Sequence, residues 1–194
     1  MKTLSTLLNE FDGRHKSEDQ LIECFIEIAK TAIYGGHFLI NKKMKIRIAE
    51  VEFYFHSEND NESNIHDWGM YHRGKDLDSF TVGSLHPHRS GIDVTFERKN
   101  SYRASFLIRK YQIDDDEKII TTPSYLGEDM FGYTGCICGD GPKIVWMNDI
   151  EQTTDNLELT KKTRINLTAY DEKGKSLKTN GKRELDKRLW RFGL

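Results

Sequence analysis

The segment KIRIAEVEFYFHSE, residues 45–58, constrains the fold more than any other part of the chain. Its β-branched and aromatic side chains predict a strand, because they favour the pleated, extended backbone. With the two-residue period of a strand, one face carries Ile46, Ile48, Glu50, Glu52 and Tyr54. The other face then carries Arg47, Ala49, Val51, Phe53 and Phe55. Neither face is cleanly polar, so we predict a strand with apolar neighbours on both faces.

A capping box predicts a helix before this strand. Ser17 and Gln20 have the spacing in which each side chain bonds the other residue's backbone, and the helix should run to about Tyr34. The glycine pair 35–36 should end it. Its apolar stripe is Leu21, Phe25, Ile28, Ala29 and Ala32. A weaker pattern predicts a second helix over residues 3–11.

Further strands are predicted after a long polar loop, residues 56–79. Alternating apolar residues indicate strands over 91–97 and 102–113, and the charged turn RKNS between them favours a hairpin. Two more strands are expected near 163–167 and 188–194.

A proline and a lysine-rich segment predict a short helix and a loop in the C-terminal part of the chain. Pro142 is placed as at the first turn of a helix, so we expect a short helix over 143–150. The lysine-rich segment 171–182 should be a loop between the last two strands.

The order of these elements predicts one α+β domain over residues 1–194. Runs of strands with helices to one side favour a curved, mainly antiparallel sheet, on which the N-terminal helices of residues 1–40 pack. The length allows one sizeable core, and there is no repeat and no linker-like segment.

Several classes of protein do not fit the sequence. No run of about 18 apolar residues is present, so we expect no membrane association. The first twenty residues are charged too early for a secretory signal, so a cytoplasmic location is expected. Cys24, Cys136 and Cys138 are too few for a disulfide framework and lack zinc-site spacing, so we expect partly buried, reduced thiols.

The charge distribution is uneven. Residues 161–194 hold eleven Lys or Arg against four Asp or Glu, whereas the rest of the chain is acidic. Such a basic end is either a solvated surface or a contact for a polyanion.

The carboxylates of Glu50 and Glu52 allow two interpretations. Side by side on one strand, one could be a general base while the other orients a substrate or pairs with a cation. Alternatively, both form ion pairs with neighbouring strands.

A group of histidines raises the possibility of a metal site. His66, His72, His86 and His88 are accompanied by Asp67 and Asp93. Their spacing matches no zinc or iron signature, so we expect no metal; a metal-dependent hydrolase using His66, His72, His88 and Asp93 is the third alternative.

Several separated motifs resemble the alkyladenine (3-methyladenine) DNA glycosylases. RIAEVEFYF resembles their Ile-Val-Glu-x-Glu-x-Tyr strand, and FLIR their strand that ends in Leu-Ile-Arg. GDGPKIVWM is similar to the family's helix start that contains Gly-Pro. KTRINL, together with KRLWRFGL, is similar to the motifs with which the family's sequences end. The motifs follow the family's order over residues 45–194.

The chain also departs from the family pattern. HPHRSG replaces an aromatic-rich run, the loop after Tyr54 is longer, and Glu97 stands near an asparagine position. WGMYHRG and GIDVTFE look like a divergent branch of glycosylase-like proteins.

The resemblance implies a fold like that of these glycosylases and of formyltransferase C-terminal domains. It implies that Glu52 is the general base that activates water. Tyr54 and His66 would form the walls of a slot for a flipped base. His88 would be a second stacking ring, and Arg109 would offset the carboxylates.

The function expected from this resemblance is excision of alkylated or deaminated purines from duplex DNA by base flipping. It requires no cofactor and no metal. Glu50 would pair with a cation, and Lys182 and Arg183 would contact the nucleic-acid backbone. The alternative is a binding module on the same scaffold that recognises a nucleic acid or nucleotide without cleaving it.

Overall fold

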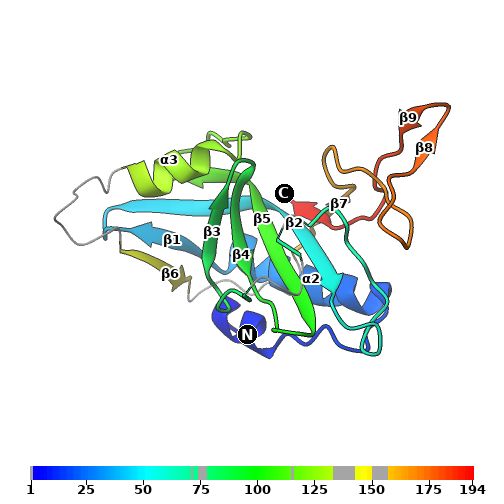
Figure 1. Cartoon of the computed structure of the whole chain (residues 1–194). Coiled ribbons are helices and arrows are strands. Elements are labelled where there is room, and N and C mark those ends of the chain that lie inside the picture. The colour runs from blue at the N-terminus through cyan, green and yellow to red at the C-terminus, as the bar shows by residue number, and fades with distance from the viewer. Residues whose placement is uncertain (1, 71, 74–77, 115, 133–142, 150–156) are drawn as a thin grey trace.

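The computed structural model describes residues 2–194 except 71, 74–77, 115, 133–142 and 150–156, and forms one α+β domain (Figure 1). The helices are α1 (Leu4–Glu10), α2 (Glu18–Tyr34) and α3 (Tyr125–Phe131). The strands are β1 (Gly36–Ile40), β2 (Met44–Ser57), β3 (Leu85–His88), β4 (Gly91–Thr95), β5 (Tyr102–Ile113), β6 (Ile144–Asn148), β7 (Thr160–Lys162), β8 (Lys178–Thr179), β9 (Lys182–Arg183) and β10 (Arg191–Gly193).

The main sheet is antiparallel and curled around the long strand β2. Its order is β3-β4-β5-β2-β1-β6, with β10 paired to β2 and β7 paired to β10. β5 follows β2 along almost its whole length, whereas β1 covers the start of the other edge of β2 and β10 a later part. The predicted curved antiparallel sheet and the predicted 91–97/102–113 hairpin are therefore confirmed.

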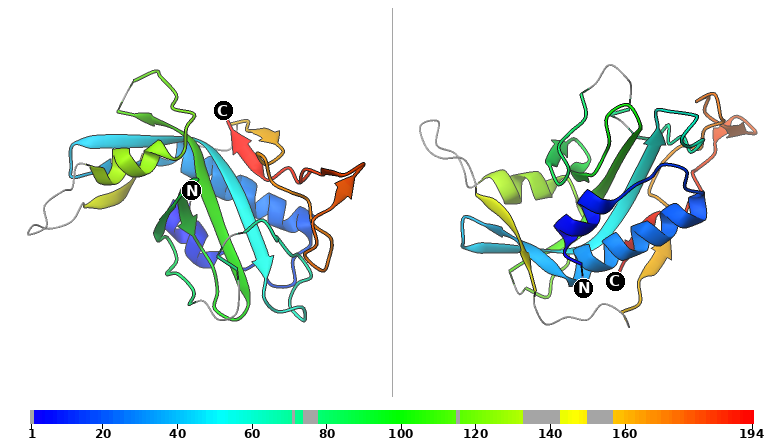
Figure 2. Two further views of the ribbon diagram at one scale, coloured as in Figure 1. Left: turned by 45° about the horizontal axis from the view of Figure 1, so that its top comes forward. Right: turned by 90° about the horizontal axis from the view of Figure 1, so that it is seen from below.

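The core lies between this sheet and helix α2 (Figure 2). The predicted capping box of Ser17 and Gln20 is present in both directions. Phe25 of α2 stacks on Phe53 of β2 at 4.4 Å between ring centroids and meets Trp190 edge-on at 5.4 Å. The helix predicted over residues 3–11 is α1, which packs beside α2. These two helices cover one face of the sheet.

The predicted division of β2 into two faces is wrong before Glu50. Its pairing with β5 shifts register between Ile48 and Glu50 and again between Glu50 and Val51, which marks a β-bulge. One extra residue reverses the alternation of side chains. Ile46 and Ile48 therefore belong to the same core cluster as Val51 and Phe53, not to the face of Glu52.

The helix predicted over 143–150 is also wrong. Residues Ile144–Asn148 form the edge strand β6, which pairs with β1. Strand β1 itself was not predicted from the sequence. Trp146 meets Phe38 edge-on at 5.0 Å across this pair. The run Ile-Val-Trp-Met favours a strand, and the free edge of β1 provides its partner. Pro142 itself lies outside the described residues.

Three further segments differ from the predictions. The strand expected near 163–167 lies earlier, as β7, and the predicted lysine-rich loop 171–182 contains β8 and the start of the β8–β9 hairpin. Within the predicted strand 188–194, β10 spans only Arg191–Gly193.

Cys24 is a partly buried free thiol, as expected, and burial raises its pKa. Cys136 and Cys138 lie outside the described residues. No described helix has the length and apolar character needed to cross a membrane.

Candidate functional site

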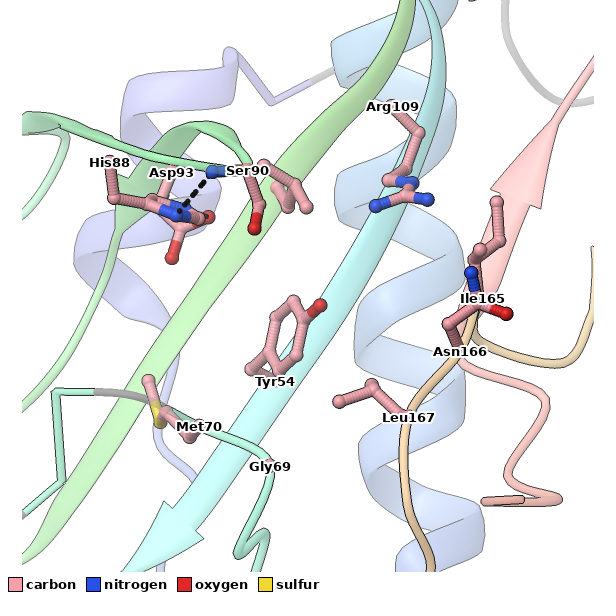
Figure 3. A pocket seen from close by; sticks show the side chains of 11 residues that line it. Tyr54, Gly69, Met70, His88, Ser90, Asp93, Arg109, Ile165, Asn166 and Leu167 are labelled. Atoms are coloured by element: carbon pink, nitrogen blue, oxygen red, sulfur yellow. Dashed lines mark hydrogen bonds and ion pairs between the residues drawn. The ribbon is translucent and has the colours of Figure 1, made fainter. Parts of the chain in front are cut away.

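A cavity of about 350 Å³ opens on the face of the sheet opposite α2 (Figure 3). Strands β2, β3, β4 and β5 contribute side chains to it, and the chain segments around residues 69–70 and 165–167 contribute further lining. The lining residues are Tyr54, Gly69, Met70, His88, Ser90, Asp93, Leu107, Arg109, Ile165, Asn166 and Leu167. Both apolar and polar groups line this cavity, as in sites for small organic ligands.

Tyr54 is held by a buried carboxylate beneath the cavity. Its hydroxyl donates a hydrogen bond of 2.5 Å to Oε1 of Glu52, whose side chain is fully buried. Oε2 of Glu52 accepts the backbone N–H of Ile165 at 2.9 Å and lies 3.9 Å from Nε of Arg109. Burial and the negative charge of Glu52 raise the pKa of Tyr54, so its hydroxyl stays protonated. Glu52 thus fixes the Tyr54 ring and joins it to the 165–167 segment.

A second carboxylate lies on the opposite side of the cavity. Oδ1 of Asp93 lies 3.1 Å from Nε2 of His88, and Oδ2 accepts the hydroxyl of Ser105 at 3.1 Å. The backbone N–H of Ser90 donates to Nδ1 of His88 at 3.2 Å. Arg109 approaches from another side, with its guanidinium toward the same end of the cavity as the Tyr54 hydroxyl (Figure 3). The cavity therefore places a guanidinium across from a carboxylate.

A buried ion cluster joins two walls of the cavity. Arg164, whose side chain is fully buried, pairs with Asp67 through both terminal nitrogens and with Asp186 at 2.9 Å. Arg188 adds contacts of 3.3 Å to Asp67 and 2.6 Å to Asp186. Arg164 also lies 5.1 Å over the ring of Tyr54. The cluster ties the loop before Gly69 to the segment that begins with Ile165.

The close approach of these two walls depends on a glycine. A Cβ at Gly69 would lie 2.8 Å from Cδ2 of Leu167 and 3.2 Å from Oδ1 of Asp67.

The sequence carried no signal for the ion cluster, because Arg164 is 97 positions from Asp67.

Most of the residues expected to form the site are brought together. Tyr54, His88 and Arg109 line the cavity, while Glu52 accepts a hydrogen bond from the Tyr54 hydroxyl without lining it. His66 is elsewhere: its ring lies 5.3 Å from that of His56, beside a separate cavity of about 630 Å³. Asp93 also lines the cavity, although the sequence indicated it only as a possible metal ligand.

Glu50 pairs with cations of neighbouring strands, as one interpretation of the sequence expected. Its Oε2 lies 3.0 Å from Nζ of Lys110 and 3.4 Å from Nζ of Lys162, and its Oε1 lies 3.8 Å from Nε of Arg191. A Cβ at Gly193 would lie 2.8 Å from Cγ of Glu50. Glu50 therefore pairs with cations from β5, β7 and β10, on both sides of β2.

The histidine group divides among separate partners. His72 pairs with buried Glu97 at 3.0 Å, and His66 lies 3.4 Å from Asp60. Within the described part of the chain, no group of three or more His, Cys, Asp or Glu side chains is arranged to hold a metal ion.

The predicted backbone contacts, Lys182 and Arg183, are exposed on β9. The β8–β9 hairpin projects from the body of the sheet (Figure 1). Not all of the basic excess is available there, because Arg164 and Arg188 belong to the buried ion cluster and Lys162 pairs with Glu50.

Comparison with protein-family models, with curated proteins and with solved structures found no match.

Proposed function

We propose that this protein is a DNA glycosylase-like enzyme that receives a flipped, damaged purine in the Tyr54 cavity, on a fold related to the alkyladenine glycosylases. The observation that supports the proposal is the arrangement around Tyr54. Its ring lines a cavity, its hydroxyl is held by buried Glu52, and Arg109 and Asp93 line the same cavity. An aromatic surface with a few oriented polar groups is what recognition of a single extruded base requires.

The size of the cavity suits a small planar ligand. At about 350 Å³ it lies near the lower end of the ~300–1,000 Å³ typical of small-molecule sites. Met70, Leu107 and Leu167 provide apolar surface in the same cavity as the Tyr54 ring. A base that stacks there gains about 1–3 kcal/mol, which offsets part of the few kcal/mol that flipping costs.

The Asp93 side of the cavity favours a purine that carries positive charge, whereas Arg109 on the other side offsets Glu52. The side chain of Asp93 lines the cavity, and that of Glu52 lies directly beneath its wall. A purine alkylated at N3 or N7, such as N7-methylguanine, is cationic in the nucleotide, so the Asp93 carboxylate stabilises it in the cavity. Such a purine also leaves without being protonated. The reaction therefore needs a water and a group that accepts the proton of that water, rather than a general acid.

The phosphate backbone is the proposed partner of the β8–β9 hairpin. Lys182 and Arg183 are exposed on that projecting element. Neutralised phosphates release counterions, so binding to DNA should weaken steeply with salt. Reversing the charge of both residues should lower affinity and reduce the salt slope by about 2. An unchanged slope would remove the hairpin from the interface.

The experiment that tests the function is single-turnover release of base from duplex DNA that contains one N7-methylguanine or one hypoxanthine. We expect release of the free base, equal with and without a chelator. Tyr54→Ala should weaken capture of the base by about 1–3 kcal/mol, seen in the concentration dependence of the rate. Release abolished by chelation would favour the histidine–aspartate metal alternative.

A binding module without catalysis is the second candidate, and the burial of Glu52 favours it. Both oxygens of Glu52 are bonded within the protein, and its side chain is fully buried. Tight binding of the modified duplex with no base release from any lesion would support this candidate over the enzyme.

A further inference from the structure

Two carboxylates flank Tyr54, but they differ in access to the cavity. Glu52 does not line it, and its oxygens are engaged by the Tyr54 hydroxyl and the Ile165 N–H. Its side chain is fully buried and is not part of the cavity lining, so a water in the cavity does not reach it. Asp93 lines the cavity directly, and its side chain is drawn beside that of His88 in Figure 3.

The hydrogen bonds of Asp93 leave room for a ligand. His88 of β3 and Ser105 of β5 flank it from the neighbouring strands and contact one oxygen each at 3.1 Å. A carboxylate oxygen accepts two hydrogen bonds, so each oxygen of Asp93 keeps capacity beyond these contacts. The side chain is only 4% exposed, so a water or hydroxyl bound there is shielded from bulk solvent.

The tautomer of His88 makes it a donor to Asp93. The backbone N–H of Ser90 can only donate, so Nδ1 of His88 is an acceptor and the ring proton of the neutral imidazole is on Nε2. Nε2 faces Oδ1 of Asp93. His88 is thus a positioning residue that orients the carboxylate, as a second group orients the base in many catalytic sites.

We infer that Asp93, rather than Glu52, is the carboxylate that activates the attacking water, an inference that rests on the proposed function. In this step the water oxygen bonds to the anomeric carbon of the sugar, and Asp93 takes the released proton. The glycosidic carbon–nitrogen bond breaks, and its electron pair leaves with the purine and neutralises the positive charge. Glu52 positions Tyr54 and the 165–167 segment.

The test compares the two isosteric variants Asp93→Asn and Glu52→Gln in single-turnover release of N7-methylguanine from duplex DNA. Loss of a general base costs on the order of 10²–10⁴ in rate, so Asp93→Asn should fall by that factor while still binding the duplex. Glu52→Gln keeps an oxygen for Ile165 but loses the charge that holds the Tyr54 hydroxyl, so its rate should fall by less than that of Asp93→Asn. Circular dichroism and thermal unfolding establish that both variants fold.

Chemical rescue separates a catalytic carboxylate from a structural one. Asp93→Gly should be nearly inactive, and added formate should restore part of the rate by entering the vacated space as a carboxylate. Formate should have no effect on Glu52→Gln. If Glu52→Gln loses the larger factor, or formate fails to restore Asp93→Gly, the assignment of Asp93 is overturned while the proposed function stands. If the wild type releases no base from any lesion, the proposed function fails, and the assignment fails with it.

Discussion

Replacing Arg164 with methionine tests whether the buried ion cluster holds the cavity walls. The side chain of Arg164 is fully buried, and so is that of its partner Asp67. The second partner, Asp186, is 6% exposed. Methionine preserves much of the side-chain length that packs on Tyr54 and Trp190 but removes the charge and every hydrogen bond.

The expected loss follows from the charges left behind. Breaking a buried ion pair by removing one partner costs about 3–5 kcal/mol, because the remaining charge is buried and uncompensated. Arg188 still contacts both aspartates, at 3.3 and 2.6 Å, so we expect the lower end, about 3 kcal/mol. With a urea m-value of about 2 kcal/mol/M, the unfolding midpoint should fall by about 1.5 M.

Equilibrium urea unfolding at pH 7 is the assay, and Arg14→Met is the matched control. Arg14 pairs with Asp12 at 2.6 Å, but both side chains are 39% exposed. An exposed pair contributes about 0–1 kcal/mol, so the control should lose no more than that. If Arg164→Met loses less than about 1 kcal/mol, the ion cluster does not hold the cavity walls together.

Acid provides an independent check on the same cluster. Burial by itself would raise the pKa of Asp186, but the hydrogen bond from Arg188 and the charge of Arg164 hold the pKa below its ordinary value of 3.8. A lowered pKa in the folded state contributes stability above pH 3.8 that is lost as the pH falls through the lowered value. The stability difference between the wild type and Arg164→Met should therefore shrink below about pH 4.

Two further changes test other parts of the fold. Gly193→Ala should lower stability by about 1–3 kcal/mol in thermal unfolding, because the new Cβ would lie 2.8 Å from Cγ of buried Glu50. Gly181→Ala is the control: Gly181 has a positive φ but open space around it, so this variant measures backbone strain without a clash. Burial lowers the pKa of His56 to about 4 from 6.5, so the unfolded chain binds a proton that the folded one excludes and stability falls as the pH drops from 6.5 to 4. The fall should be at most about 3 kcal/mol and absent in His56→Gln, and an equal fall in that variant would assign the loss to other groups.

Local signals were sufficient for several elements. The capping box of Ser17 and Gln20 and the apolar stripe that follows it determine where α2 begins and which side packs on the sheet, because both act within a few turns of one helix. Alternation determines the hairpin of β4 and β5, whose strands are joined by a short turn. The same kind of signal identified β2 as a strand and Glu50 as a partner for cations.

The tertiary structure alone decided how the site is built. The bulge of β2 follows from its register against β5 and reverses the facing of Ile46 and Ile48, which no count along the strand reveals. Residues Ile144–Asn148 form the edge strand β6 because they pair with β1. Asp93 lines the cavity only because β3 and β5 flank it. Arg164 and Asp67, 97 positions apart, meet only after the chain has folded. Each of these depends on a partner remote in sequence, and the energy of a buried charge or a strand register is set by that partner rather than by local propensity.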